Sequence, residues 1–402
     1  MKTKIRFLRT TFFIISMIFC AINLKATDFN SIVARQIDSM RIVYNFPSVA
    51  YGVIRNDSII VLNTVGFRDI ETKDKAQLTD HYHIGSNTKA FTGFLAGKMV
   101  ENHLINWETK FFDLYPELKI ESNPIYFDMT LRQLLSHRAR MINFNQNSEV
   151  YPIIDKYEKN ISDSLSPSQK RYYLIKEVLK HEPLPPYEQC KDNYSNAGII
   201  AASLMLEKVT DKSWEELIMQ VSNDLDLDIH IGWPNDLGIN QPKGHINPKY
   251  WKLDINKDLI PISEDLKMFH YNHQYSLLTA PCGNISITLK GFLKFLRLNI
   301  DGENGESNYL KPETYRQIFT SFPTYSVGWW VENDSSVMKY AHRGSNGTFY
   351  SFAGLSGIAK PKIGIVVMIN TYKEEGLTDI IDFLSTHYAL APAQLYRVGK
   401  DK

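Results

Sequence analysis

Strand-like runs lie at both ends of this 402-residue chain, and helix-like segments fill its middle. Near the start, residues 47–70 hold two runs rich in β-branched residues, with a turn at Arg55-Asn56-Asp57 between them. Four more runs follow late in the chain, at 325–334, 337–344, 347–360 and 363–371. Because strands need partners, this order predicts an α+β fold in which both ends of the chain complete one sheet.

Helical periodicity supports the same division. Residues 28–44 and the closing segment LTDIIDFLSTHYAL (377–390) both place apolar side chains at helical spacing. Further helix-like segments lie between residue 86 and about residue 221, for example at 130–137, 168–180 and 196–210. We therefore expect a sheet lobe at about 27–85 and 275–402, with a helical lobe at about 86–274 inserted between its two parts.

The first 26 residues have the layout of a secretory signal peptide. A basic start precedes an apolar run from Thr11 to Leu24, and Ala26 precedes a polar stretch. The alternative is an uncleaved anchor helix, but the run is short for a span of about 20 residues. Lipidation at Cys20 is disfavoured because Phe19 before it is bulky. We expect cleavage after Ala26 and an exported, periplasmic protein, rather than a membrane-anchored or secreted one.

Composition argues against several classes of function. A formal net charge of +1 predicts no basic surface for nucleic acid. Cys190 and Cys282 remain after signal cleavage; they could pair, although two separate buried thiols fit better, and they form no disulfide framework. His81 and His83 have no third ligand spaced nearby, so we expect no metal site and no cofactor.

The segment HIGSNTKAFTG (83–93) places Ser86 where a helical pattern begins and Lys89 three residues later. Residues three apart share a helix face, so the amine can reach the hydroxyl. Burial eases the loss of the lysine proton and makes the amine a base for the serine. The alternative is that Ser86 is an ordinary helix cap, because serine is a preferred N-cap and Ser-x-x-Lys recurs at 336–339.

A second motif, NYSNAGI (193–199), places Tyr194 and Asn196 just before a strong helical pattern. A phenol beside a lysine ammonium ionises more easily and can accept the serine proton. The alternative is a tyrosine that packs on the core, with Asn196 as a helix cap.

A third motif, YAHRGSNG (340–347), ends a late strand-like run with His342 and continues into a glycine-rich turn. Gly344 and Gly347 allow a backbone to approach a ligand closely. His-x-Gly also occurs at 83–85 and 230–232, so position rather than the motif itself favours His342.

The three motifs, in this order, resemble those of the serine β-lactamase and penicillin-binding-protein superfamily. Tyr-Ser-Asn at 194–196 is similar to the class C branch and its esterase and D-peptidase relatives, as are the phrases TLRQLLSH, LTAPCGNISITLKGFLKF and SVGWW. The likeness spans roughly residues 30–390. It implies a β-lactamase/transpeptidase-like fold: an antiparallel sheet flanked by helices, an all-helical lobe beside it, and a site between the lobes.

The resemblance also implies roles for individual residues. Ser86 is the nucleophile that forms an acyl-enzyme, and Lys89 and Tyr194 share the role of general base. His342 stands where the lactamases have a lysine and completes the catalytic set. Substrate binding falls to three positions: Asn196 for the substrate amide, Gly344, and Ser345, whose backbone N–H joins that of Ser86 in the oxyanion hole.

Two departures from the family pattern affect the expected substrate. His342 is mostly neutral at pH 7 unless a neighbour raises its pKa, which weakens the case for a β-lactamase. Arg343 faces away from the site if neighbours alternate on the strand, and otherwise could bind a carboxylate. Arg138 and Arg140 replace the usual Thr-Ser-Gly; they either meet an anionic substrate or form a solvated surface.

We therefore expect an exported serine hydrolase that acts through an acyl-enzyme on a peptide, D-peptide or ester, with the cell wall as one source. One alternative is a β-lactamase or penicillin-binding protein. Another is a non-catalytic binding or scaffold protein that keeps the fold. The expected partner is a small-molecule or peptide substrate, with no nucleic acid and no membrane span after cleavage; the oligomeric state stays open.

Overall fold

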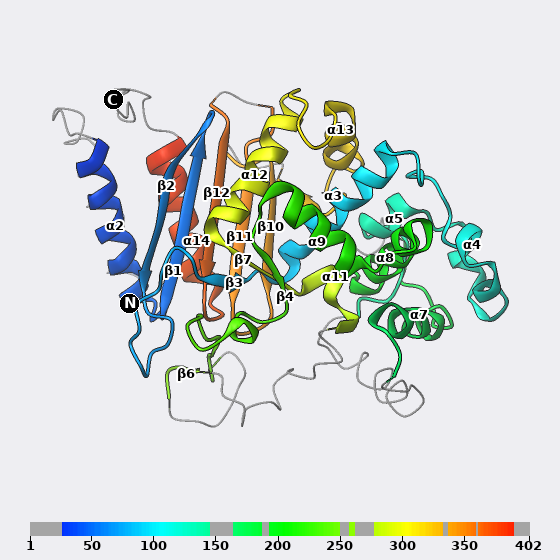
Figure 1. The fold of residues 1–402 in the computed structure, drawn as a ribbon, viewed down its shortest axis with the longest axis horizontal. Coiled ribbons are helices and arrows are strands. Elements are labelled where there is room, and N and C mark those ends of the chain that lie inside the picture. Colours follow the sequence, from blue (N-terminus) through cyan, green and yellow to red (C-terminus); the bar gives the residue numbers. More distant parts are fainter. Residues whose placement is uncertain are drawn as a thin grey trace.

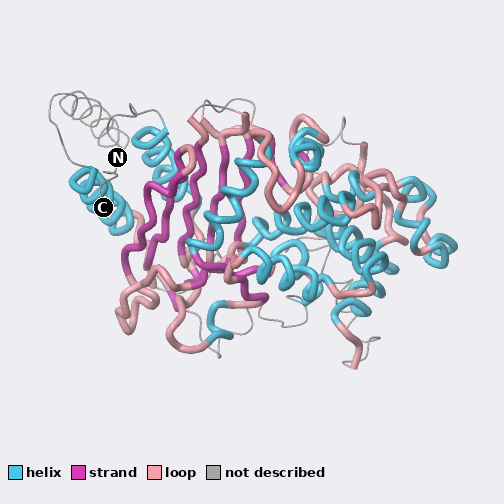
Figure 2. The backbone as a smooth tube through the Cα atoms, turned by 45° about the horizontal axis from the view of Figure 1, so that its top comes forward, coloured by secondary structure: helices cyan, strands magenta, loops and turns pink. Residues whose placement is uncertain are grey.

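The computed structural model describes residues 26–144, 164–186, 193–249, 257–261, 277–332, 337–358 and 361–389. Residues 1–25 of the expected signal peptide and Cys190 lie outside these ranges. A sheet flanked by helices forms one part of the molecule, and a group of helices stands beside it (Figure 1; Figure 2). No helix in the described ranges is both long and apolar enough to cross a bilayer.

The main sheet has seven antiparallel strands in the order β2-β1-β12-β11-β10-β9-β8. The strands are β1 (Ser48–Arg55), β2 (Ser58–Gly66), β8 (Tyr325–Ser326), β9 (Trp329–Val331), β10 (Tyr340–Ser345), β11 (Tyr350–Leu355) and β12 (Ile363–Ile369). β1 pairs with β12 from Val49↔Ile369 to Arg55↔Ile363, so the N-terminal hairpin meets the last strand. The predicted antiparallel sheet, completed from both ends of the chain, is confirmed.

Strands β1 and β12 are buried along their whole length, which explains their nearly continuous apolar sequences. Alternate side chains enter opposite layers. Val49 and Val53 pack beneath α2 (Ala26–Val43) and α14 (Glu374–Leu384), whereas Ala50 and Ile54 belong to the core that includes α12 (Leu289–Glu303). The sheet is therefore the middle layer between two helical layers (Figure 1).

Helix α8 (Asn196–Thr210) is the centre of the helical lobe, and its residues 197–207 are all buried. The other helices are α3 (Thr88–Glu101), α4 (Phe111–Leu114), α5 (Leu131–Leu135), α7 (Pro167–Val178), α9 (Trp214–Leu225), α11 (Ala280–Gly283) and α13 (Pro312–Thr320). Inside this lobe the fully buried Arg171 lies 2.6 Å from Glu207 and 2.8 Å from Glu215. This ion cluster ties α7 to α8 and α9.

A second, three-stranded sheet leads into the candidate site. Its order is β3 (His81–His83), β7 (Ile285–Thr288) and β4 (Ile229–Ile231). β4 falls in the range that the sequence places with the helical lobe, yet it pairs with β7. A two-stranded pair, β5 (His245–Ile246) and β6 (Ile260–Pro261), completes the described strands.

The run 325–334 differs from its predicted form. Its described part, residues 325–332, holds a tight hairpin, in which Tyr325 of β8 pairs with Trp330 of β9, and not one continuous strand. Gly328 makes the turn with a φ of 78°, and a β-carbon there would lie 2.5 Å from the Lys89 carbonyl oxygen. The chain reverses here because only glycine fits so close to the start of α3.

Candidate active site

Ser86 lies in η2 (Gly85–Asn87), a 3-10 turn between β3 and α3. Helix α3 begins at Thr88, and its N-cap is Asn87, whose side chain makes no capping hydrogen bond. Ser86 is therefore not the cap of α3, which was the alternative explanation for a serine at this position. Its hydroxyl remains available for other contacts.

Lys89 extends from the first turn of α3 back to Ser86. Its Nζ donates to Ser86 Oγ at 3.0 Å and to the carbonyl oxygen of Cys282 at 2.7 Å. The side chain of Lys89 is fully buried. The structure thus brings the predicted serine and lysine into direct contact, and α11 supplies a second acceptor for the amine.

Tyr194 reaches the same lysine from the other side of the site. It stands two residues before α8, is half-buried, and its ring centroid lies 4.7 Å from Lys89 Nζ. An ammonium over a tyrosine face at this distance makes a cation–π contact. Three residues from two distant parts of the sequence therefore meet at one point.

Asn196 is the first residue of α8, but it does not cap that helix. Ser195 is the cap: its Oγ accepts from the Gly198 N–H at 3.1 Å and donates to Ile142 O at 2.6 Å. The Asn196 amide donates to Phe144 O at 3.0 Å, and its oxygen is buried without a partner among the described residues. This carboxamide oxygen therefore keeps an unused capacity to accept a hydrogen bond.

His342 is buried, and both of its ring nitrogens are engaged within the protein. Nδ1 lies 2.6 Å from Arg343 O, which can only accept, so Nδ1 carries the proton. Nε2 then accepts from the Tyr325 hydroxyl at 3.0 Å. Burial, with a smaller effect of the Lys89 charge, lowers the pKa of His342 to about 3. This imidazole is neutral at physiological pH and does not supply the positive charge of a lysine.

Gly344 and Gly85 let η2 touch strand β10. A β-carbon at Gly344 would lie 2.0 Å from Ile84 O and 2.6 Å from Ser86 N, and one at Gly85 would lie 2.3 Å from Ser345 N. Gly85 also needs its positive φ of 50°. The two glycines thereby bring the backbone nitrogens of Ser86 and Ser345 to one junction.

The side chain of Asn87, the N-cap of α3, joins η2 to strands β10 and β11 by hydrogen bonds. With its amide oxygen toward the strand, it accepts from Ser351 Oγ at 2.8 Å and from Gly344 N–H at 3.3 Å, while its nitrogen donates to His342 O at 3.1 Å. The Ser345 side chain instead serves its own turn, since its Oγ donates to Phe349 O at 2.7 Å and accepts from Gly347 N–H at 2.8 Å.

The three arginines that the sequence offered as ligands for an anionic substrate are all engaged elsewhere. Arg343 is exposed on the opposite face of β10 and pairs with Glu374 at 3.3 Å, as strand alternation predicts. Arg138 donates to Thr324 Oγ1 at 2.7 Å, and Arg140 donates to Leu184 O at 2.6 Å. Arg138 and Arg140 are half-buried and tie loops together, which differs from the solvated surface that was one expectation.

Four residues near the site were not assigned a role from the sequence. Tyr325 holds His342, and the Cys282 carbonyl holds Lys89. His83 accepts from the Gly85 N–H at 3.2 Å, directly before the serine. His137 packs 4.3 Å from the ring of Tyr194. The motif phrases LTAPCGN, HIGS and LLSH contain three of them, and Tyr325 directly precedes SVGWW, but no local pattern indicates that a side chain or a carbonyl group will face the site.

Cys282 does not act through its thiol. Burial raises the pKa of this thiol to about 11, so it stays protonated. It forms no disulfide within the described part of the chain, and its prospective partner Cys190 lies outside that part.

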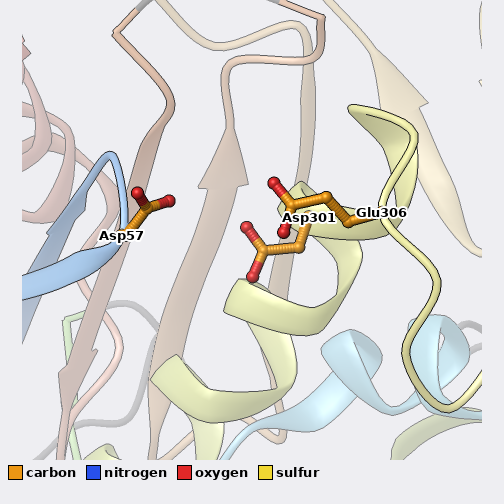
Figure 3. A group of neighbouring side chains, drawn as sticks. All are labelled: Asp57, Asp301 and Glu306. Atoms are coloured by element: carbon orange, nitrogen blue, oxygen red, sulfur yellow. The ribbon is translucent and has the colours of Figure 1, made fainter.

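A group of carboxylates lies away from this site, between the β1–β2 turn and the end of α12. Asp57, Asp301 and Glu306 bring their oxygens within 4.8 Å of one another (Figure 3). Lys362 Nζ sits 3.3 Å from Asp301 and also pairs with Glu306, and Arg297 lies 3.4 Å from Asp57. Because two cations already pair with its three carboxylates, this group is an ionic network that joins the turn to α12, and we assign no metal to it.

Comparison with known proteins agrees with the motifs and the fold. The sequence matches the Beta-lactamase family over residues 33–382. It is similar to Protein flp of Staphylococcus aureus (strain NCTC 8325 / PS 47), with 21% identity over 347 residues. That match covers 85% of this chain and 63% of the relative, so the chain spans less than two thirds of the curated relatives' length.

Three solved structures share the fold. The octameric penicillin-binding protein homologue from Pyrococcus abyssi matches with a TM-score of 0.70 and 18% identity, over 89% of this chain and 76% of that one. D-amino acid amidase from Ochrobactrum anthropi SV3 matches with a TM-score of 0.67 and 16% identity, over 89% of this chain and 100% of that one. FmtA from Staphylococcus aureus matches with a TM-score of 0.64 and 15% identity, over 90% of this chain and 92% of that one. These matches confirm the β-lactamase/transpeptidase-like fold, and the family match over most of the sequence shows that this chain belongs to the Beta-lactamase family.

Proposed function

We propose that this protein is an exported serine hydrolase that acts through an acyl-enzyme on a peptide, D-peptide or ester. One observation carries the proposal: a fully buried lysine amine lies 3.0 Å from the Ser86 hydroxyl. An amine within hydrogen-bond distance of a serine hydroxyl is placed to act as the base that activates this nucleophile. The family and its fold support a serine hydrolase of the acyl-enzyme type.

The proposed acylation begins with removal of the serine proton. The neutral amine of Lys89, or the phenolate of Tyr194 beside its ammonium, takes this proton as Ser86 Oγ attacks the substrate carbonyl carbon. The new C–O bond places negative charge on the carbonyl oxygen, and the N–H groups of Ser86 and Ser345 stabilise it. The tetrahedral intermediate then expels an amine or alcohol, which takes the proton from the base, and acyl-Ser86 remains.

Deacylation repeats the same steps with water. Water attacks the acyl carbon and gives one proton to the base, the C–O bond to Ser86 breaks, and the serine regains its proton. The products are a free carboxylic acid and the resting enzyme. No cofactor is needed for this sequence, because the base and the oxyanion donors come from the chain.

Two features of the site bear on the substrate. The neutral His342 provides no fixed charge for a substrate carboxylate at the position where the lactamases use lysine. The unpaired amide oxygen of Asn196 is placed to accept an N–H group from a substrate amide. The first feature disfavours a β-lactam, whose carboxylate would lack a cation there, and the second suits any substrate that carries an amide N–H group. An exported enzyme would meet D-peptides of the cell wall first, so these are the first substrates to test.

Export itself rests on the layout of residues 1–26. Expression of the full chain in a Gram-negative host, followed by fractionation and N-terminal sequencing, tests it. A periplasmic product that begins at Thr27 supports cleavage after Ala26; an uncleaved product in the membrane fraction supports the anchor helix instead.

An active-site probe tests the catalytic proposal. The mature protein is treated with a fluorophosphonate and with a labelled penicillin, and the modified peptide is identified by mass spectrometry. We expect label on Ser86, none in Ser86→Ala, and full label in the control Ser39→Ala, whose exposed serine lies on α2. Equal labelling of the wild type and Ser86→Ala would refute the proposal.

Assays on the same mature protein distinguish this proposal from its alternatives. Rapid turnover of nitrocefin would identify a β-lactamase, and stable acylation by penicillin without turnover would identify a penicillin-binding role. A chain that reacts with no probe, while binding a cell-wall peptide, would be the non-catalytic descendant that the sequence leaves open.

A further inference from the structure

His137 follows helix α5 in a backbone conformation that glycine adopts more easily. Its φ is 57°, in the left-handed region, and its side chain is only 4% exposed. A residue with a side chain stays in such a conformation where surrounding contacts hold it there. The contacts of the imidazole therefore explain why a histidine occupies this position.

The imidazole of His137 lies between two tyrosines. Its ring centroid is 4.3 Å from that of Tyr194 and 4.3 Å from that of Tyr325. Tyr325 is itself held by its hydrogen bond to His342, so one side of the imidazole rests on a fixed neighbour. Tyr194 also packs edge-on against Tyr325. In addition it stacks on Trp330, with ring planes 5° apart.

A hydrogen bond fixes the tautomer of His137. Its Nδ1 lies 3.1 Å from the backbone N–H of Ser195, which can only donate, so Nδ1 accepts and the proton sits on Nε2. Nε2 is buried with no partner within the described ranges. The imidazole therefore holds the chain at Ser195, the residue next to Tyr194, and packs against the ring of Tyr194 at an interplanar angle of 48°.

The groups around His137 keep it uncharged. Burial, followed by the charge of Lys89, holds the pKa of His137 well below its usual range. A neutral ring does not compete with the Lys89 ammonium for the face of the tyrosine.

We infer that His137 is a positioning residue that holds Tyr194 against the Lys89 ammonium, through its ring contact with the tyrosine and its hydrogen bond to Ser195. The inference rests on the proposed function, since it assigns His137 a role in the acylation of Ser86. Its contacts are with Tyr194, Tyr325 and Ser195, and it acts on the reaction through the tyrosine.

Two variants separate the ring from the backbone. Asparagine adopts the left-handed conformation readily, and its side-chain oxygen can accept from Ser195, so His137→Asn removes mainly the ring contact. His137→Gly removes ring and hydrogen bond together while it relieves the backbone. The controls are His103→Asn and His103→Gly, because His103 has a φ of 59° but is exposed and lies at the far end of α3.

The measurement is the rate at which a fluorophosphonate labels Ser86 between pH 6 and pH 11. We expect both His137 variants to fold and to label on the order of 10- to 100-fold more slowly, because the base is misplaced. We also expect their pH–rate profile to differ in shape from that of the wild type, since Tyr194 loses its fixed place beside Lys89. Added imidazole should restore part of the rate of His137→Gly, and the His103 variants should match the wild type.

The outcomes are distinct. Wild-type rates and profiles in both His137 variants, with the wild type labelled on Ser86, would overturn the inference and leave the proposed function intact. A slower rate with an unchanged profile and no rescue would show a merely structural role and would also overturn it. A wild type without label on Ser86 would remove the proposed function, and the inference with it.

A measurement on the wild type keeps the inference testable if both variants fail to fold. The ¹⁵N signals of the His137 ring report its tautomer and its surroundings. We expect a neutral ring protonated at Nε2 whose signals shift when Ser86 is acylated, because acylation changes the contacts of Lys89 and Tyr194. Signals that are identical before and after acylation would refute the coupling.

Discussion

Lys89 Nζ lies between Ser86 Oγ and the carbonyl oxygen of Cys282, at 3.0 Å and 2.7 Å. The first contact joins the lysine to its own helix turn, and the second joins it to a segment almost 200 residues later. The tertiary fold thus holds this amine at a fixed distance from the serine.

Loss of the lysine amine is expected to affect acylation more than loss of the histidine. Lys89→Met should slow labelling of Ser86 by about 10²- to 10⁴-fold, because proton removal from the serine depends on it directly. His342→Ala should cost less, since both ring nitrogens of His342 bond within the protein. Lys98→Met, on the same helix, is the control. The reverse order of the two losses would move the base role to His342.

A methyl group at Gly344 is expected to separate the nucleophile from the strand. In Gly344→Ala the β-carbon would fall 2.0 Å from Ile84 O and 2.6 Å from Ser86 N, so η2 has to move away from β10. Overpacking of this kind costs about 1–3 kcal/mol of stability, and the displaced oxyanion donors should slow acylation about 100-fold or more. Gly283→Ala is a matched control, because a β-carbon there meets nothing within 4 Å. Equal rates in both variants would show that the junction is not needed.

Acid should destabilise the protein well before its carboxylates are fully protonated. Burial lowers the pKa of His83 and of His245 to about 4, and that of His342 to about 3, from a usual value of 6.5. Below pH 6.5 the unfolded chain takes up protons at these rings and the folded chain does not, so the free energy of unfolding falls as the pH falls. Each ring contributes about 1.4 kcal/mol per pH unit between pH 6.5 and its folded pKa.

One buried carboxyl opposes this trend. Burial raises the pKa of Glu303 to about 7, so the folded state takes up its proton first and gains stability as the pH falls from about 7 to 4.5. The histidines outnumber it, and urea denaturation at pH 7, 6 and 5 should show a steep net loss. The exposed control His103→Asn should keep the same slope. A free energy of unfolding that is flat over this range would contradict the prediction.

Loss of Arg171, the cation of the buried ion cluster in the helical lobe, is expected to lower the stability of the protein strongly. Arg171→Met should cost about 3–5 kcal/mol, because it leaves the buried Glu207 carboxylate without its partner. Chemical denaturation measures this cost. The control is Arg316→Met, which breaks an exposed pair with Glu313 and should change stability far less. Similar losses in the two variants would show that burial of the cluster does not matter.

Several elements could be predicted from the sequence because their signals are local. Helix α8 has the predicted bounds, since its apolar pattern begins directly after a capping serine. The hairpin β1–β2 follows from two β-rich runs and a short turn with Asn56 in a left-handed conformation. Where the periodicity is interrupted the prediction fails: Gly328 divides the run 325–334, and the reason is its contact with Lys89, far away in the sequence.

The candidate site shows the same limit. The motifs indicate Ser86, Lys89, Tyr194 and His342, but not the charge state of the histidine, which depends on its burial and on the hydroxyl of Tyr325. Neither do they indicate that His137 lies against Tyr194, because that contact joins the segment after α5 to the segment before α8.

By itself, the sequence determined the order of helices and strands, the antiparallel sheet built from both ends of the chain, and the family. Hydrophobic periodicity and turn residues act over a few neighbours, so one chain is enough to read them. Only the tertiary structure decided which groups contact one another. The Lys89 amine meets the Ser86 hydroxyl, the Tyr194 ring lies next to that amine, and the neutral imidazole of His137 packs against Tyr194. Burial and hydrogen-bond partners depend on segments that are far apart in the sequence, and these set the protonation of the histidines and the geometry of the site.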